Sequence, residues 1–507
     1  MEVKTLQDVI RHGALCFGSQ AAFRYKEKKE VAEKTYLDLN QDSMAVSRMV
    51  ESLGMGGKHI ALLGATSYPW IISYFGITGS GSVAVPIDAQ LPAPAIWELL
   101  NRADVEMLIY DEIRADVAAG IREHCPKISK VISMQAREDA PPVLSLSALL
   151  ARHAGSYEGT VSPDQLATIL FTSGTTGISK GVMLSHQNLT DNAVCLDMKI
   201  PTGTVTMTML PINHVYCLTM DIVKGLYIGT TICINDSIMR VQKNLSLFQP
   251  EIVLMVPMII QSILAKLEEA YRQAPAGTPK PLIAKAALGG RLTTICSGGA
   301  YLDPEYIERF GEYGITILQG YGMTECSPVI STNLAWANEK GSVGKLLPNC
   351  QAKVVDHELW VKGSSVMMGY YKMPEETAEA LEDGWLKTGD LGYVDENNYV
   401  YITGRKKNLI ILANGENVSP EELENQLSRS PLVKEILVRE TGNVIEAEIF
   451  PDREYAEKAG ISNVQEQLQA LIDEFNQDMP TYKRIHHFIV REQEFEKTAA
   501  RKIKRFL

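Results

Sequence analysis

The stretch FTSGTTGISKG, residues 171–181, concentrates glycines, hydroxyl side chains and one lysine at a single point of the chain. The apolar runs QLATILF (165–171) and GVMLS (181–185) flank it, and both are typical of strands. Glycines let successive backbone N–H groups converge on an anion, while hydroxyls and a lysine add hydrogen-bond donors and a positive charge. The pattern predicts a phosphate-binding loop that joins two strands.

A flexible hairpin turn is the alternative interpretation, because glycine-rich turns are common. The loop is not a Walker A motif, which requires G-x-x-x-x-G-K-[ST] between a strand and a helix. Here the spacing is G-x-x-G-x-x-K, and a strand is expected to follow. The stretch GSGSVA (79–84) mimics a dinucleotide fingerprint, but it follows a predicted helix and precedes a predicted strand, which is the wrong order. The rest of the sequence has to decide between the two interpretations.

Short apolar runs alternate with amphipathic segments from residue 60 to about residue 322. Strands are expected at 59–64, 82–88, 105–111, 252–257, 293–299 and 315–322, and helices near 66–79, 95–103, 259–272 and 303–313. This alternation is typical of βα-wound parallel sheets, here in two halves. After about residue 350, β-branched and aromatic residues with Gly, Asn and Asp turns predict mostly antiparallel sheet. The fold class is therefore α/β, with two wound βαβ-type sheets and a β-rich subdomain in a large N-terminal domain.

A small α+β domain is expected at the C-terminus, with the large domain at 1–404 and the small one at 405–507. Ser419 is the predicted N-cap of its first helix, with Pro420 at the first helical position and Glu422 completing a capping box. A second helix is expected at 463–477 and a strand at 486–492.

Composition narrows the class of protein further. The 507 residues are 45% apolar and 22% charged, and the net charge of −12 argues against nucleic-acid binding over the whole surface. The eight cysteines form no CxxC pair and no Cys/His cluster, so free thiols in a reducing compartment are expected. Neither a secretory layout nor an apolar run of the ~18 residues that span a membrane is found. We expect a cytoplasmic protein without a transmembrane segment.

The glycine-rich stretch resembles the T-[ST]-G-[ST]-T-G-x-P-K phosphate loop of the adenylate-forming superfamily, which includes acyl-CoA synthetases, peptide-synthetase adenylation domains and luciferases. Six further stretches resemble motifs of that superfamily in the same order: LPINHVY (210–216), SGGA (297–300), GYGMTE (320–325), WLKTGDLG (385–392), GRKKNLI (404–410) and KTAARKIKR (497–505). The resemblance covers the chain from about residue 10 to its end. Within the superfamily it is closest to bacterial long-chain fatty acid–CoA ligases.

The resemblance implies a two-step ligase that uses ATP, Mg²⁺ and CoA. A carboxylic acid, of medium or long chain by this resemblance, attacks the α-phosphate of ATP to give acyl-AMP and pyrophosphate, and the CoA thiol then displaces AMP. An acyl–acyl carrier protein ligase is the alternative, with a protein-bound pantetheine as acceptor. A non-catalytic nucleotide-binding regulator is a third possibility, against which the intact Lys180, Glu325, Asp390 and Lys502 argue. Acyl chain length and oligomeric state stay open.

The resemblance also implies roles for individual residues. The phosphates would be held by Thr172, Ser173, Gly174, Thr175, Thr176, Gly177 and Lys180. The adenine would lie against Tyr321, with Gly298, Gly299, Ala300, Gly320 and Gly322 close to it. Thr324 would donate to the α-phosphate, and Glu325 with Thr172 would bind Mg²⁺. Asp390 and Arg405 would bind the ribose hydroxyls, and Lys502 would neutralise charge at the α-phosphate.

The acyl side of the site is less defined by the sequence. His214 would lie beside the acyl carboxylate or the thiol tunnel, although a lone histidine is more often structural. Amino-acid activators carry an early Asp in this segment, whereas here Asp221 comes late, which favours an uncharged acyl group.

The small domain is expected to be mobile, turning about a hinge near Lys407 so that Ala413–Gly415 faces the thiol tunnel. Three residues depart from the family pattern: Ser179 replaces a proline, and His357 and Arg501 each replace a glycine. Arg501 puts the backbone before Lys502 in doubt, because glycine there would allow a positive φ.

Overall fold

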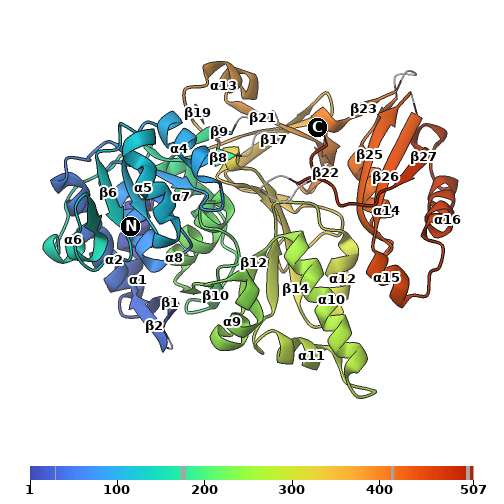
Figure 1. The fold of residues 1–507 in the computed structure, drawn as a ribbon, viewed down its shortest axis with the longest axis horizontal. Coiled ribbons are helices and arrows are strands. Elements are labelled where there is room, and N and C mark those ends of the chain that lie inside the picture. The colour runs from blue at the N-terminus through green and yellow to red at the C-terminus, as the bar shows by residue number, and fades with distance from the viewer. Residues whose placement is uncertain (29, 173–178, 413–415, 443, 498–502, 506–507) are drawn as a thin grey trace. The chain divides into compact units, whose positions relative to one another are not determined.

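The computed structural model describes residues 1–507 except 29, 173–178, 413–415, 443, 498–502 and 506–507 (Figure 1). The chain forms two compact units. The first contains Met1–Ala352, Val361–Leu386 and Asn397–Tyr399, and the second contains Lys353–Trp360, Lys387–Glu396 and Val400–Leu507. The chain therefore passes between the units several times before Val400, and the single cut at residue 404 stays a prediction.

An eight-stranded sheet organises one half of the first unit, in the order β19-β9-β8-β4-β3-β5-β6-β7. Its parallel strands are β3 (His59–Leu63), β4 (Val83–Ile87), β5 (Val105–Tyr110), β6 (Lys130–Ser133), β7 (Val143–Ser145) and β8 (Leu166–Thr172). At one edge, β9 (Lys180–Ser185) and β19 (Gly369–Tyr370) run antiparallel. The connecting helices include α3 (Tyr68–Gly79), α4 (Ala93–Arg102) and α5 (Ala115–His124). Alternating apolar runs and helices thus give the expected wound sheet.

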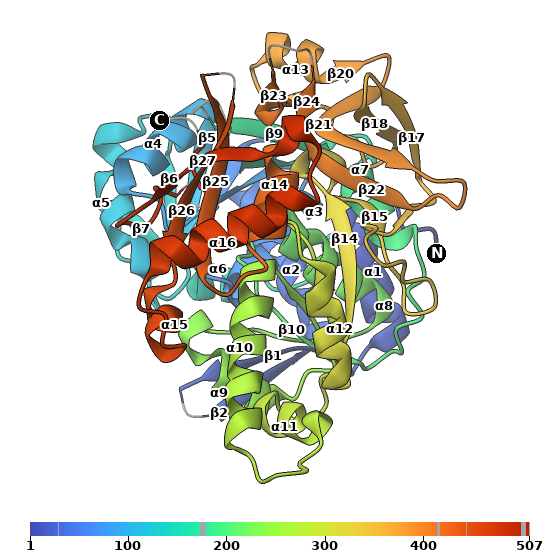
Figure 2. The ribbon, with the colours of Figure 1, turned by 90° about the vertical axis from the view of Figure 1, so that its right-hand side faces the viewer.

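A nine-stranded sheet organises the other half, in the order β16-β15-β14-β13-β12-β10-β11-β1-β2. Its parallel strands are β1 (Ala21–Glu27), β10 (Val205–Met207), β11 (Thr231–Cys233), β12 (Ile252–Met255), β13 (Thr294–Ser297) and β14 (Thr316–Gly322). Antiparallel strands β2 (Glu30–Thr35), β15 (Val329–Thr332) and β16 (Lys345–Leu346) complete the two ends. Helices α10 (Pro257–Gln273), α11 (Lys280–Ala287) and α12 (Pro304–Glu312) pack together beside it (Figure 2). Both predicted wound halves are confirmed.

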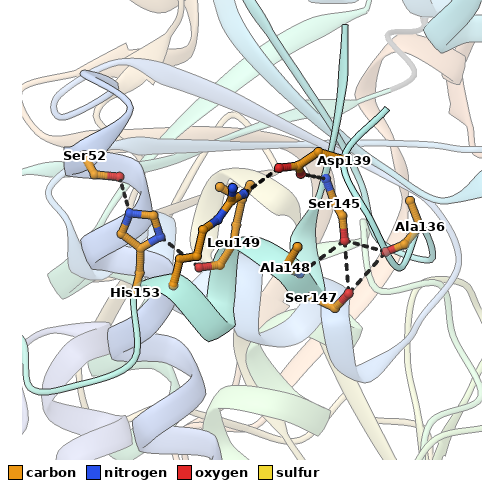
Figure 3. A network of polar contacts seen from close by, with 9 residues as sticks. Ser52, Ala136, Asp139, Ser145, Ser147, Ala148, Leu149 and His153 are labelled. Carbon is orange, nitrogen blue, oxygen red and sulfur yellow. Dashed lines mark hydrogen bonds and ion pairs between the residues drawn. The ribbon is translucent and has the colours of Figure 1, made fainter. Parts of the chain in front are cut away.

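A polar network fixes the edge of the eight-stranded sheet at β7 (Figure 3). Ser145 caps α6 (Leu146–Arg152) by accepting from the Ala148 N–H at 3.2 Å, and its hydroxyl donates to the Ala136 carbonyl at 2.6 Å. Asp139 accepts the Ser145 N–H at 2.8 Å, and His153 bonds the Ser52 hydroxyl at 2.8 Å. Because these bonds cap a helix and tie it to neighbouring elements, the network is structural.

The second unit holds most of the chain's C-terminal elements. They are β22 (Val400–Arg405), β23 (Ile410–Ile411), β24 (Asn417–Val418), α14 (Pro420–Leu427), β25 (Val433–Thr441), β26 (Val444–Pro451), α15 (Arg453–Lys458), α16 (Val464–Gln477) and β27 (Ile485–Val490). β25 and β26 are antiparallel, and Leu423, Ala447 and Leu468 are among the buried residues of their core. The strand expected at 486–492 is β27, and it runs parallel to β26. The reason is that α15 and α16 lie between these strands as a crossover connection.

The start of α14 corrects one prediction. Ser419 is the N-cap and Pro420 opens the helix, as expected, but no side-chain capping bond forms. The Ser419 hydroxyl donates instead to Glu421 Oε2 at 3.1 Å, and the Glu422 carboxylate binds Lys483 Nζ at 2.7 Å. The capping box is therefore wrong, because a distant lysine competes for its carboxylate.

All eight cysteines are free thiols, as expected. Within the described part of the chain, no helix combines the length and apolarity needed to cross a bilayer.

Candidate active site

The predicted phosphate loop lies between β8 and β9, which form an antiparallel pair in the first unit. Thr172 at the end of β8 is opposite Lys180 at the start of β9, and the Thr172 hydroxyl donates to the Lys180 carbonyl at 3.5 Å. The strands predicted before and after the loop are therefore confirmed. The other predicted loop residues, Ser173, Gly174, Thr175, Thr176 and Gly177, lie outside the described residues.

An arginine that the sequence analysis missed holds the second end of this loop. The Arg102 guanidinium, from the last turn of α4, donates to the Ser179 carbonyl at 2.6 Å. It also lies 5.9 Å from the centre of the Phe171 ring. A proline at position 179 would offer the same carbonyl, so the replacement of proline by Ser179 does not remove this contact.

Glu325 follows the C-terminal end of β14, in a short 3₁₀ turn, Thr324–Cys326. The turn needs Gly322, because a Cβ there would lie 2.0 Å from the Pro328 carbonyl oxygen. Glu325 is 9% exposed, and its backbone carbonyl accepts the Met367 N–H at 2.9 Å. Its carboxylate Oε1 accepts the Tyr370 hydroxyl at 2.8 Å.

Tyr370 brings two motifs together that are far apart in the sequence. Besides its bond to Glu325, its ring lies 4.7 Å from Lys180 Nζ, a cation–π distance. Burial raises the pKa of Tyr370, and the negative charge of Glu325 adds to the rise, so the hydroxyl stays protonated and donates. Tyr370 was not predicted as a site residue, although the aromatic pair after Gly369 was a local signal.

The predicted adenine-binding residues lie at the carboxyl ends of two parallel strands of the nine-stranded sheet. β13 and β14 are parallel neighbours with Ser297 opposite Gln319, so Gly298–Ala300 and Gly320–Gly322 lie side by side at their carboxyl ends. Ligands of wound sheets bind at this edge. Gly298 allows close contact, since a Cβ there would lie 3.0 Å from the Tyr216 ring, and Gly299 has a φ of 82°. Contact of Tyr321 with adenine stays a prediction.

His214 is an exposed residue between the buried Ile212 and Val215, just before a π-helix, Tyr216–Val223. Partial desolvation by the chain around it lowers the pKa of His214, while the carboxylate of Asp88 acts in the opposite direction. A neutral imidazole can accept a proton or a hydrogen bond at neutral pH. Its role toward the acyl carboxylate stays a prediction.

Asp221 is buried within the same π-helix, at 3% exposure. Neither carboxylate oxygen has a conventional hydrogen-bond partner among the described residues, and the thiol of Cys217 is the neighbour that favours the charged form. Burial raises the pKa of Asp221 well above its usual range. Asp221 is therefore held neutral and is not a ready anion for a substrate ammonium group.

The residues predicted to bind the ribose belong to the second unit. Asp390, in β21 (Trp385–Val394), is paired in register with Arg405 in β22, and Arg405 Nε lies 2.7 Å from Asp390 Oδ1. Beside them, Glu358 binds Lys406 Nζ at 2.8 Å and accepts the Gly389 N–H at 2.9 Å. The predicted pair is thus brought together. Lys502, Arg501 and Ala413–Gly415 lie outside the described residues.

Comparison with known proteins gives the class of protein. The sequence profile described as AMP-binding enzyme matches residues 11–371, and the profile described as AMP-binding enzyme C-terminal domain matches residues 407–506. The chain therefore belongs to the AMP-binding enzyme family, and the resemblance to adenylate-forming enzymes is confirmed.

Relatives that are named as CoA ligases or CoA ligase-like proteins share between a quarter and a third of the sequence over the matched residues. Long-chain-fatty-acid–CoA ligase FadD15 of Mycobacterium bovis is 29% identical over 433 residues, which are 76% of this chain and 72% of that protein. Long-chain-fatty-acid–CoA ligase of Bacillus subtilis is 27% identical, over 86% of this chain and 82% of its own. 4-Coumarate–CoA ligase-like 9 of Oryza sativa subsp. japonica is 30% identical, over 80% and 75%.

Solved structures share the fold. The anthranilate CoA ligase AuaEII in complex with anthranoyl-AMP superposes with a TM-score of 0.85 at 21% identity, covering 99% of this chain and 96% of that one. MatB from Rhodopseudomonas palustris with bound ATP gives 0.83 at 24% identity, covering 99% and 97%. At these identities the likeness supports the α/β fold with its smaller C-terminal domain.

Proposed function

We propose that this chain is an AMP-forming acid–thiol ligase that activates a fatty acid with ATP and transfers the acyl group to CoA. The proposal depends on one observation: Lys180 Nζ lies over the ring of Tyr370, and Glu325 accepts a hydrogen bond from the hydroxyl of the same tyrosine. One group is suited to phosphate and the other to a hard metal ion, and an ATP-dependent ligase needs both. Membership of the AMP-binding enzyme family supports it independently.

In the first step, a carboxylate oxygen of the acid attacks the α-phosphorus of ATP. A new P–O bond forms, the bond to pyrophosphate breaks, and the electron pair leaves with pyrophosphate. The barrier falls when positive groups offset the charge on the phosphoryl oxygens. We assign this task to Lys180 and Lys502, with Thr324 as a hydrogen-bond donor to the α-phosphate.

Glu325 has one carboxylate oxygen that could bind Mg²⁺. Its Oε1 is occupied by Tyr370, whereas no described residue donates to Oε2. A carboxylate oxygen without a donor is a ligand that Mg²⁺ prefers. When bound, the ion would neutralise phosphate charge, with Thr172 as the second proposed protein contact.

In the second step, the CoA thiolate attacks the acyl carbonyl carbon, and AMP leaves with the electron pair of the mixed anhydride bond. The first step needs Lys502 at the α-phosphate, and the second needs room for the pantetheine. We therefore propose that residues 405–507 turn against residues 1–404 between the two steps, about a hinge near Lys407.

Two observations support a fatty acid over an amino acid. The relatives from Mycobacterium bovis and Bacillus subtilis are named long-chain-fatty-acid–CoA ligases. In this chain Asp221 is held neutral by burial, so it offers no anion to a substrate ammonium group. Other relatives are named for 4-coumarate and feruloyl substrates, so aromatic acids are the natural competitors in a test.

Pyrophosphate release tests the proposal. We expect release with medium- or long-chain saturated fatty acids at a kcat/KM at least tenfold above that with 4-coumaric, ferulic, anthranilic or amino acids. Thioester formation would then be measured with free CoA and with a holo acyl carrier protein, and CoA is the expected acceptor. Release with an aromatic acid alone would refute the fatty-acid assignment, and thioester on the carrier protein alone would refute the CoA assignment.

A further inference from the structure

Tyr370 touches two groups to which the proposed function gives different tasks. Its hydroxyl donates to Glu325 Oε1 at 2.8 Å, and its ring lies 4.7 Å from Lys180 Nζ. The tyrosine is 7% exposed, so both contacts are made with little competing water. One rigid side chain therefore joins a carboxylate beyond β14 of the nine-stranded sheet to the first residue of β9 in the eight-stranded sheet.

The backbone of Tyr370 is fixed from two sides. β19 pairs with β9 so that Tyr370 is opposite Val182, and the neighbouring bond from the Tyr371 N–H to the Gly181 carbonyl is 2.8 Å. On the other side, the Tyr370 N–H donates to Thr377 Oγ1 at 2.9 Å, on α13 (Pro374–Ala380). Tyr370 is thus held by the strand that begins with Lys180.

Gly369 makes this close approach possible. Its φ is 138°, a value that side chains other than glycine rarely adopt. A Cβ at Gly369 would also lie 2.8 Å from Thr377 Cγ2. The Gly–Tyr sequence therefore serves to place the tyrosine.

We propose that Tyr370 is a positioning residue for the ligase reaction, which orients Glu325 toward the metal ion and Lys180 toward the phosphates of ATP. The inference rests on the proposed function. A phenol that donates to Oε1 fixes the rotation of the carboxylate and reserves Oε2 for the ion. The electron-rich face of the ring attracts the ammonium group of Lys180 and restricts its long side chain.

The competing explanation is that Tyr370 only fills space in the core. Two variants separate the explanations, because Tyr370→Phe keeps the ring and its packing but loses the hydroxyl, and Tyr370→Leu loses the ring as well. Tyr371→Phe is the matched control. The Tyr371 hydroxyl also donates to a carboxylate, Asp104 Oδ2, at 2.7 Å. Asp104 is not one of the residues proposed to bind phosphate or the metal ion.

The experiment measures binding as well as rate. Binding of Mn²⁺ to the protein–ATP mixture is followed by electron paramagnetic resonance, with Mn²⁺ as the probe for Mg²⁺. Affinity for ATP in excess EDTA is measured by calorimetry, and pyrophosphate release is measured against Mg²⁺ concentration.

For Tyr370→Phe we expect Mn²⁺ binding weaker by about tenfold, the size of a lost charge-assisted hydrogen bond, and a matching rise in the Mg²⁺ requirement. Metal-free ATP affinity should change by less than about twofold, because the ring still faces Lys180. Tyr370→Leu should weaken both, and Tyr371→Phe neither.

A double-mutant comparison guards against a folding artefact. If the hydroxyl acts through the carboxylate, Tyr370→Phe should weaken Mn²⁺ binding no further once Glu325→Gln is present. Wild-type Mn²⁺ affinity in a folded Tyr370→Phe variant, or equal losses in both backgrounds, would overturn the inference. Failure of the wild-type protein itself to bind ATP or to release pyrophosphate would instead refute the proposed function.

Discussion

Asp221→Asn is expected to stabilise the protein, increasingly so as the pH rises. Asp221 is 3% exposed as a residue, and both of its buried carboxyl oxygens lack a conventional hydrogen-bond partner among the described residues. Burial raises its pKa well above the ordinary value of 3.8. An amide has nearly the same shape and no charge to desolvate, so the variant removes the titration and keeps the packing.

The sign and size of the effect follow from proton linkage. Between its unfolded and folded pKa values, Asp221 binds a proton in the folded protein but not in the unfolded chain. Its contribution to stability is therefore complete below about pH 4 and is lost as the pH rises toward the folded pKa. The limiting slope is about 1.4 kcal/mol per pH unit, so the advantage of the D221N variant should grow by up to about 3 kcal/mol between pH 5 and pH 7.

Urea unfolding of both proteins at pH 5, 6 and 7, followed by tryptophan fluorescence, measures this difference. Asp197→Asn is the matched control, because Asp197 is an exposed residue of the same unit whose Oδ1 accepts the Lys199 N–H at 2.8 Å, a bond that an amide oxygen can keep. The control should give curves parallel to wild type. If the D221N curve is also parallel to wild type, Asp221 is not held protonated and the reasoning fails.

Three further variants test the site and one unusual backbone position. Lys502→Ala should reduce acyl-AMP formation by at least 100-fold but spare thioester formation from supplied acyl-AMP, and equal loss in the two half-reactions would contradict its assigned role. Arg102→Ala should raise the KM for ATP several-fold while the free energy of unfolding falls by no more than about 1 kcal/mol, because the lost bond supports the Ser179 carbonyl; an unchanged KM would contradict this. His357 has a φ of 64°, so His357→Val should lower stability by about 1–2 kcal/mol while His357→Gly should not, as thermal unfolding can show.

The wound sheets were predictable from the sequence because their signal is local. Each parallel strand that was predicted between 59 and 322 is an apolar run of a few residues, set off from its neighbours by an amphipathic segment or a turn. Burial on both faces of the sheet imposes this pattern directly. The two strands around the phosphate loop were predictable for the same reason, since both were already visible as apolar runs, whereas their antiparallel pairing comes from the structure. The parallel strands β6, β7, β10 and β11 were not predicted, and each has only three or four residues.

Predictions failed where a contact is made by a residue far away in the sequence. The capping box at Ser419 was a sound local pattern, but Lys483 takes the carboxylate that would have completed it. Arg102 and Tyr370 act on parts of the chain about 80 residues and 45 residues away, and no local spacing encodes those contacts. The local sequence around Tyr370 does not show that it belongs to the site. Tyr370 comes close to Lys180 only because its strand, β19, pairs with β9.

The contact between Tyr370 and Glu325 also makes the site sensitive to how the two sheets of the first unit fit together. Lys180 and Tyr370 move with the eight-stranded sheet, whereas Glu325 follows β14 of the nine-stranded sheet. A 2.8 Å hydrogen bond ceases to be one after a displacement of about 0.7 Å, while a cation–π contact within one sheet is unaffected. A core variant that shifts one sheet against the other should therefore weaken metal binding before it weakens metal-free ATP binding. Loss of the two affinities in the opposite order would mean that Lys180, and not Glu325, is the group that the packing between the sheets controls.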